Sequence, residues 1–165
     1  MSHKNAIVLP WLFIGDKKCA RDRQWLRSLN IRYVVNTTPP RTEGGVTNFF
    51  EKDSDLEYLR VPLRDLQSEA LAPRLPPAMA FLERARIRED GAVLVHCNEG
   101  KSRSCAVICA YLIQTHGLQL EQALRAVRRA RPQAMPNDAF LAQLTKLDKH
   151  STVGDEAAAA AAAAA

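Results

Sequence analysis

The stretch that most constrains this chain is a short apolar run, a polar loop and a longer apolar run in direct succession. Ala92 to Val95 is strongly apolar and predicts a central, buried parallel strand. The loop, residues 96–104, reads His-Cys-Asn-Glu-Gly-Lys-Ser-Arg-Ser. Residues 105–115 are apolar on nearly all sides, which predicts a buried helix ended by Gly117. Such a loop can turn its backbone N–H groups inward beside a helix N-terminus, so it predicts an anion-binding site.

Two side chains of this loop indicate chemistry beyond anion binding. Cys97 stands at its start and Arg103 follows six positions later. If the loop closes, the sulfur lies at its floor and the guanidinium on its rim. The field that binds a phosphate dianion also stabilises a thiolate, so Cys97 is expected to be nucleophilic. Arg103 can hold two phosphoryl oxygens at once, which a lysine does less well.

Around the loop, the apolar period alternates between two and 3.6 residues, which predicts an α/β fold. We expect one compact domain with a central, mostly parallel sheet flanked by helices. Strands are expected at residues 6–9, 11–15, 31–36, 56–61 and 92–95. Helices are expected at residues 16–29, 75–88, 105–115, 118–131 and 137–147, with a long loop over residues 37–54. The domain is placed at residues 1–150, and residues 151–165, which end in nine alanines, form a low-complexity tail outside the fold.

The charge and the cysteine content indicate which partners and which cellular compartment to expect. Lys and Arg number 23 against 18 Asp and Glu, and the formal net charge of +5 is too modest to indicate nucleic-acid binding. No apolar run approaches the ~20 residues of a membrane span. Four cysteines in a chain of 165 residues do not form a disulfide-dense pattern. Reduced thiols in a cytoplasmic or nuclear protein are therefore expected.

The loop motif His-Cys-x-x-Gly-x-x-Arg-Ser, at residues 96–104, resembles the signature of the cysteine-based protein tyrosine phosphatases. Flanking segments are similar to the dual-specificity branch of that superfamily. Leu12 to Gly15 resembles its early strand, and Val61 to Asp65 its general-acid loop. Arg131-Pro132 with Pro136 to Leu141 resembles its C-terminal helical block. The resemblance runs from about residue 9 to residue 148, with residues 37–54 unmatched.

The resemblance implies a role for each matching residue. Cys97 matches the nucleophile that forms a cysteinyl-phosphate, Arg103 the phosphate clamp, and Asp65 the general acid. Ser104 matches the hydroxyl that stabilises the departing thiolate. His96 and Asn137 match supporting residues, and Asn137 is also a suitable N-cap. The substrate-binding loop consists of Asn98, Glu99, Gly100, Lys101, Ser102 and Arg103.

The function implied is hydrolysis of phosphotyrosine, and of phosphoserine and phosphothreonine, in signalling proteins, with no metal and no cofactor. Two alternatives stay open. Lys101 adds a cation to the loop, which suits a phosphatase for a non-protein polyanion such as a phosphoinositide, an RNA 5′ phosphate or a phosphoglucan. A catalytically silent phosphosite-binding module is the other, although such modules usually lack one of Cys97, Arg103 and Asp65. A nucleotide-binding loop is excluded because Val95 stands where that motif needs glycine.

Overall fold

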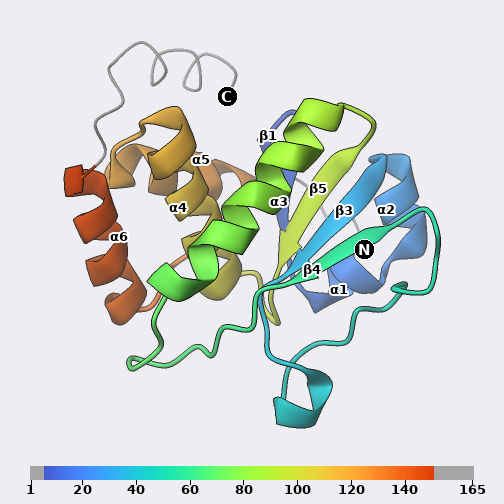
Figure 1. Cartoon of the computed structure of the whole chain (residues 1–165), viewed down its shortest axis with the longest axis horizontal. Coiled ribbons are helices and arrows are strands. Elements are labelled where there is room, and N and C mark those ends of the chain that lie inside the picture. The colour runs from blue at the N-terminus through green and yellow to red at the C-terminus, as the bar shows by residue number, and fades with distance from the viewer. Residues whose placement is uncertain (1–5, 151–165) are drawn as a thin grey trace.

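The computed structural model describes residues 6–150, and the predicted low-complexity tail lies outside this range. Within it, five strands form one sheet in the order β1-β2-β5-β3-β4 (Figure 1). Only β1 runs antiparallel to its neighbour, so the prediction of a mostly parallel sheet is confirmed. The strands are β1 (Ile7–Leu9), β2 (Leu12–Gly15), β3 (Ile31–Asn36), β4 (Glu57–Arg60) and β5 (Ala92–His96).

Helices cover both faces of this sheet (Figure 1). Alternate residues of β2 show the two layers, because Leu12 and Ile14 belong to one apolar cluster and Phe13 to the other. The first cluster includes residues of α3 (Leu75–Arg88), α4 (Arg103–His116), α5 (Leu120–Ala130) and α6 (Asp138–His150). The second includes residues of α1 (Lys17–Arg21) and α2 (Arg23–Ser28).

The central strand β5 determines where the loop after it lies. All five of its residues are buried, as expected for a parallel strand between two helical layers. Its last residue, His96, pairs with Gly15 of β2 and Asn36 of β3. Three parallel strands therefore end side by side, and the carboxyl edge of an open α/β sheet is where ligands commonly bind.

One predicted helix proved wrong in its extent. Residues 16–29 form two short helices rather than one, because Asp22 adopts an extended backbone with ψ of 90° between them. The Asp22 carboxylate accepts a hydrogen bond from the Trp25 N–H at 2.9 Å and so caps α2. Asp16 caps α1 in the same way. Because the apolar pattern continues across the break, the periodicity of the sequence gives no sign that the helix is interrupted.

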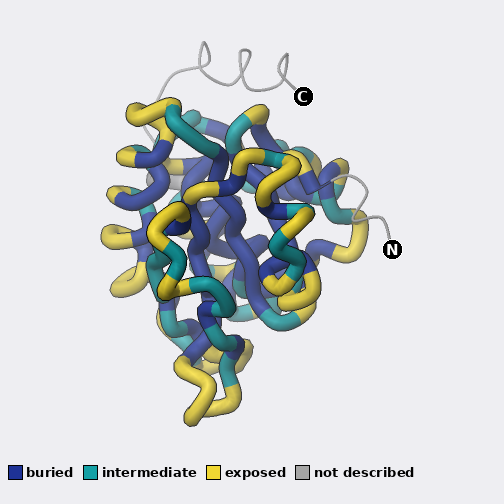
Figure 2. Tube along the Cα trace, turned by 90° about the vertical axis from the view of Figure 1, so that its right-hand side faces the viewer, coloured by how far each residue is buried: buried dark blue, intermediate teal, exposed yellow. Residues whose placement is uncertain are grey.

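The helix after the loop begins at Arg103, two residues earlier than predicted, and residues 104–113 are all buried. The long connection after β3 contains a short 3₁₀ helix, η1 (Arg41–Glu43), and a second one, η2 (Ala72–Arg74), precedes α3. Residues 40–44 are exposed and project from the end of the sheet (Figure 2). In the described part of the chain, no helix has the length and apolar character needed to cross a membrane.

Candidate active site

The loop between β5 and α4 is closed. The Gly100 N–H donates a hydrogen bond to Cys97 Sγ at 3.1 Å, which folds the loop back over the sulfur. Gly100 has a φ of +63°, a conformation that favours glycine. A Cβ there would also lie 2.6 Å from the Gly15 carbonyl oxygen and 2.4 Å from Arg131 Nε. Conformation and lack of space therefore both require glycine at this turn.

Cys97 lies at the floor of this loop, with a 2% exposed fraction. Ser104 Oγ is 3.4 Å from its sulfur, on the first turn of α4. A backbone N–H, a hydroxyl and the positive end of a 14-residue helix thus converge on one thiol. Each of them stabilises negative charge on sulfur. This geometry suits a thiolate nucleophile.

Arg103 keeps hydrogen-bond donors that no described residue uses. Its Nη1 donates one long bond, of 3.4 Å, to the carbonyl oxygen of Leu63. Its Nε is buried and makes no hydrogen bond within the described residues. Buried donors are normally satisfied, and an exception calls for a functional explanation. A tetrahedral oxyanion seated in the loop would accept from this guanidinium.

Asp65 reaches the loop from the connection that follows β4. Its Oδ1 accepts a hydrogen bond from Ser102 Oγ at 2.6 Å and another from Asn137 Nδ2 at 2.9 Å. The Asn137 N–H donates to the same Ser102 hydroxyl at 3.0 Å. Both donors meet Oδ1, and Oδ2 makes no hydrogen bond within the described part of the chain. The second oxygen is thus available to carry a proton.

His96 supports the loop from below. Its side chain is fully buried, and burial lowers the pKa of the imidazole to about 4, so the ring is neutral at pH 7. Nδ1 lies 3.2 Å from the carbonyl oxygen of Cys97. A carbonyl only accepts, so Nδ1 carries the proton. The ring therefore holds the backbone at the nucleophile's own position.

Sequence reasoning missed an ion pair that holds the outer side of the loop. Arg131 Nη2 lies 2.8 Å from Asp16 Oδ2 and also donates to the carbonyl oxygen of Glu99. Its Nε donates to the carbonyl oxygen of Gly100 at 2.8 Å. Partial burial alone would raise the pKa of Asp16, but the Cys19 N–H and Arg131 hold it below its ordinary value. The motif Arg131-Pro132 was the available signal, since it is part of the resemblance.

The remaining residues of the loop contribute to its structure mostly through backbone groups. Glu99 and Lys101 have exposed side chains, whereas their carbonyl oxygens accept from Arg131 and from the Met135 N–H. The Asn98 carbonyl oxygen accepts from the Lys17 N–H at 3.2 Å. These bonds hold the loop from outside through its carbonyl oxygens.

A thiol bonded inside a closed loop, an arginine with spare donors and a nearby carboxylate are typical of cysteine-based phosphatases. The chain belongs to one family within that class. The family described as "Dual specificity phosphatase, catalytic domain" matches residues 12–150.

Similar proteins agree with this assignment. Dual specificity protein phosphatase Mpk3 of Drosophila melanogaster is 39% identical over 142 residues, which make up 86% of this chain and 33% of that protein. Dual specificity protein phosphatase 9 of Homo sapiens is 36% identical over 142 residues. Our chain spans about a third of the length of these two relatives (33% and 35%).

Solved structures share the fold. The crystal structure of human DUSP28 superposes with a TM-score of 0.77 at 35% identity and covers 86% of this chain and 94% of that one. A mouse protein titled as a dual specificity phosphatase complexed with zinc tungstate gives a TM-score of 0.78 at 36% identity, with 90% and 89% covered. The human tyrosine phosphatase-like serine/threonine/tyrosine-interacting protein gives 0.78 at 26% identity, with 87% and 94% covered.

Proposed function

We propose that this chain is a protein phosphatase domain that hydrolyses phosphotyrosine, phosphoserine and phosphothreonine through a cysteinyl-phosphate. The observation that carries the proposal is the closed loop, in which the Gly100 N–H donates to Cys97 Sγ at 3.1 Å beside the N-terminus of α4. The names of the relatives, which are dual specificity protein phosphatases, support the choice of reaction.

In the first step, the phosphoryl group binds to the inward N–H groups of the loop and to the spare donors of Arg103. The Cys97 thiolate attacks phosphorus, and the bond from phosphorus to the substrate oxygen breaks. Asp65 transfers a proton from Oδ2 to that oxygen, so the product leaves as a neutral hydroxyl. Arg103 neutralises charge on the equatorial oxygens as the transition state forms.

In the second step, Asp65 acts as a base. It takes a proton from water, the water oxygen attacks phosphorus, and the sulfur–phosphorus bond breaks. The electron pair of that bond returns to Cys97 Sγ, and the Ser104 hydroxyl, 3.4 Å away, stabilises the resulting thiolate. Inorganic phosphate then leaves the loop.

The two alternatives have less support. Lys101, which motivated a non-protein polyanion, has an exposed side chain, and the named relatives are protein phosphatases. A silent binding module is suggested by the name of one structural neighbour, a phosphatase-like interacting protein. The fold therefore does not decide activity by itself. Cys97, Arg103 and Asp65 are all in place here, and this favours an enzyme.

We further propose that the phosphatase domain occupies residues 1–150 and that the alanine-rich residues beyond take no part in it. We also place the chain in phosphoprotein signalling, in a cytoplasmic or nuclear setting. The four free thiols support that setting.

The nucleophile is tested with Cys97→Ser. Turnover of an aryl phosphate should fall below detection, because a serine hydroxyl is not ionised at pH 7. Binding of tungstate, a tetrahedral oxyanion, should stay measurable by calorimetry, since the loop N–H groups and Arg103 remain. Cys109→Ala, which changes a buried thiol on α4, is the matched control and should keep activity. Hydrolysis at the normal rate by the Cys97→Ser chain would remove the assignment.

A further inference from the structure

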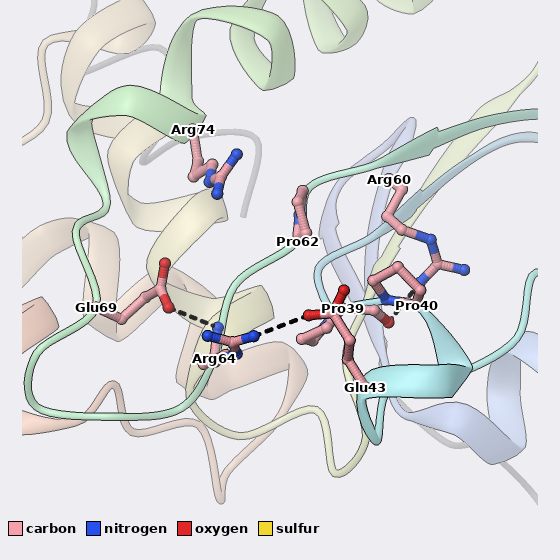
Figure 3. A pocket seen from close by; sticks show the side chains of 8 residues that line it. All are labelled: Pro39, Pro40, Glu43, Arg60, Pro62, Arg64, Glu69 and Arg74. Atoms are coloured by element: carbon pink, nitrogen blue, oxygen red, sulfur yellow. Dashed lines mark hydrogen bonds and ion pairs between the residues drawn. The ribbon is translucent and has the colours of Figure 1, made fainter.

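A separate cavity of about 370 Å³ lies beside the segment that carries Asp65 (Figure 3). Three arginines line it: Arg60 at the end of β4, Arg64 in the connection that follows, and Arg74 in η2. We call this cavity the arginine pocket. Two glutamates, Glu43 and Glu69, and three prolines complete its lining.

Arg60 brings a positive charge whose hydrogen-bond partners are all neutral. Its Nη1 donates to the carbonyl oxygens of Thr38, Pro39 and Val46 at 2.8–3.0 Å, and its Nη2 donates to Asn48 Oδ1. Among the described residues it forms no ion pair. Burial lowers the pKa of this guanidinium because its charge is partly removed from water. These contacts orient the arginine without pairing it directly with a carboxylate.

Arg74 and Arg64 add charge that a ligand can use. Arg74 is exposed and has no ion-pair partner within residues 6–150, and Figure 3 shows it on the opposite side of the pocket from Arg60. Arg64 Nη2 pairs with Glu43 Oε2 at 2.8 Å, in an exposed contact. Exposed pairs of this kind contribute little, so an incoming anion can compete for Arg64.

The two glutamates do not cancel the positive charge of the pocket. Glu43 is engaged by the Arg64 side chain, and Glu69 Oε2 accepts from the Arg64 N–H at 3.2 Å. Three cations against two carboxylates leave a net positive lining. Guanidinium groups bind planar carboxylates and phosphates through paired hydrogen bonds. The chemistry therefore fits an anionic group.

The arginine pocket shares a wall with the proposed active site. Pro62 and Arg64 line it, while the carbonyl oxygen of Leu63, between them, accepts from Arg103 Nη1 at 3.4 Å. Asp65 follows directly, and consecutive Cα atoms lie about 3.8 Å apart. A substrate polypeptide with its phosphoresidue in the loop would pass this wall within a few residues.

We propose that the arginine pocket binds an anionic group of the substrate polypeptide, a carboxylate or a second phosphate, a few residues from the phosphoresidue being hydrolysed. This inference rests on the proposed function and adds a specificity element to it. The resulting preference for acidic peptides comes from the charge on the lining of the pocket. It therefore affects the hydrolysis of peptides and leaves the hydrolysis of small aryl phosphates unchanged.

The test compares peptides that share one phosphotyrosine and differ only in neighbouring residues. One set is neutral, one carries glutamate and one carries phosphoserine, each placed one to four residues before or after the phosphotyrosine. The wild-type chain should show a kcat/KM about three- to tenfold higher for one acidic placement than for the neutral peptide. Because the proposed function includes phosphoserine, only dephosphorylation of the phosphotyrosine is counted. A larger gain with phosphoserine then identifies a phosphate as the natural occupant, and an equal gain with glutamate identifies a carboxylate.

Arg74→Ala should remove most of this gain while the rates with the neutral peptide and with an aryl phosphate stay unchanged. Arg74→Glu should go further and make the acidic peptide the poorer substrate. Arg125→Ala, which changes an exposed arginine on α5, is the control and should keep the preference. An equal fall with every substrate in Arg74→Ala, or no acidic preference in the wild-type chain, overturns the proposal.

Peptide affinities measured with the Cys97→Ser chain separate this inference from the proposed function. If the wild-type chain hydrolyses the aryl phosphate and shows no acidic preference in rate or affinity, only the arginine pocket assignment fails. If the aryl phosphate is not hydrolysed, the proposed function fails. An acidic preference in affinity that Arg74→Ala removes would still support the pocket in that case.

Discussion

At the scale of single residues, the side-chain amide of Asn137 makes two different hydrogen bonds, one through its oxygen and one through its nitrogen. Its Oδ1 accepts from the Phe140 N–H at 2.9 Å and caps α6, while its Nδ2 donates to Asp65 Oδ1 at 2.9 Å. Ser102 donates to the same carboxylate oxygen. The two donors point the opposite oxygen of Asp65 away from them. Asn137 is therefore a positioning residue for the proposed acid.

Replacement of Asn137 by serine separates the roles of these two hydrogen bonds. Serine caps helices about as well as asparagine, so the free energy of unfolding should change by less than about 0.5 kcal/mol. The shorter side chain does not reach Asp65, and kcat for phenyl phosphate should fall about tenfold for one lost hydrogen bond. A nitrophenyl phosphate, whose leaving group needs little protonation, should be affected much less.

The variant for comparison is Asp65→Asn. It should show the same dependence of kcat on the leaving group, and its kcat for phenyl phosphate should fall by about 10²–10⁴-fold. If Asn137→Ser slows both substrates equally, the amide does not act through the acid.

At the scale of the elements, two helices that line the core end in left-handed residues of different kinds. Gly117 follows α4 with a φ of +65°, whereas Glu89 follows α3 with a φ of +51°. A non-glycine residue in this conformation costs about 1–2 kcal/mol. Glu89 is exposed and forms no ion pair among the described residues. Strain at this helix end is therefore not offset by a charge contact.

Glu89→Gly should stabilise the domain by about 0.5–1 kcal/mol, because relief of the left-handed strain exceeds the entropic cost of glycine in the unfolded chain. The midpoint of thermal unfolding should rise by about 1–4 °C in calorimetry. Gly117→Ala is the matched change in the other direction and should lower stability by about 1 kcal/mol. A lower midpoint for Glu89→Gly would contradict the strain assigned to this cap.

At the scale of the whole molecule, the carboxyl edge of the sheet gathers residues that are far apart in the chain. Asp65 and Ser102 are 37 positions apart, Asp65 and Asn137 are 72 apart, and Asp16 and Arg131 are 115 apart. The closed loop is thus held by contacts that exist only in the folded chain. Its stability should follow the stability of the domain.

Domain stability should fall as the pH drops from about 6.5 towards 4. Folded His96 has a pKa of about 4, because burial disfavours its charged form, whereas an unfolded histidine titrates near 6.5. Between these values the unfolded chain binds the extra proton, so stability rises with pH by up to about 1.4 kcal/mol per unit. Urea unfolding at pH 5 and pH 7 measures the effect.

His96→Phe removes the titrating group and should flatten this slope, even if the variant is less stable at both pH values. Part of the slope should persist, because burial also lowers the pKa of His116. The pKa of Asp16 is lowered too, but that carboxylate loses its stabilising charge only below its ordinary value near 3.8. A slope between pH 5 and 7 that is identical in His96→Phe and in the wild-type chain would rule out His96 as its source.

The sequence by itself determined the features that depend on neighbouring residues. The apolar run before Cys97, the glycine at position 100 and the apolar helix after Arg103 are contiguous, so period and composition predict a strand, a connecting loop and a helix. The parallel sheet follows from alternating strands and helices. The single helix expected over residues 16–29 failed because Asp22, a local hydrogen-bonding residue, interrupts an apolar pattern that continues beyond it.

Tertiary structure alone decided the contacts between segments. No local pattern shows that Asp16 pairs with Arg131 or that Ser102 and Asn137 meet on one oxygen of Asp65, because only chain folding brings those residues within hydrogen-bond distance. The arginine pocket is of the same kind, since Arg60 ends β4 whereas Arg74 lies in η2 and Glu43 in η1. Local sequence specifies backbone conformation, whereas the relative positions of distant side chains follow from how the helices pack on the sheet.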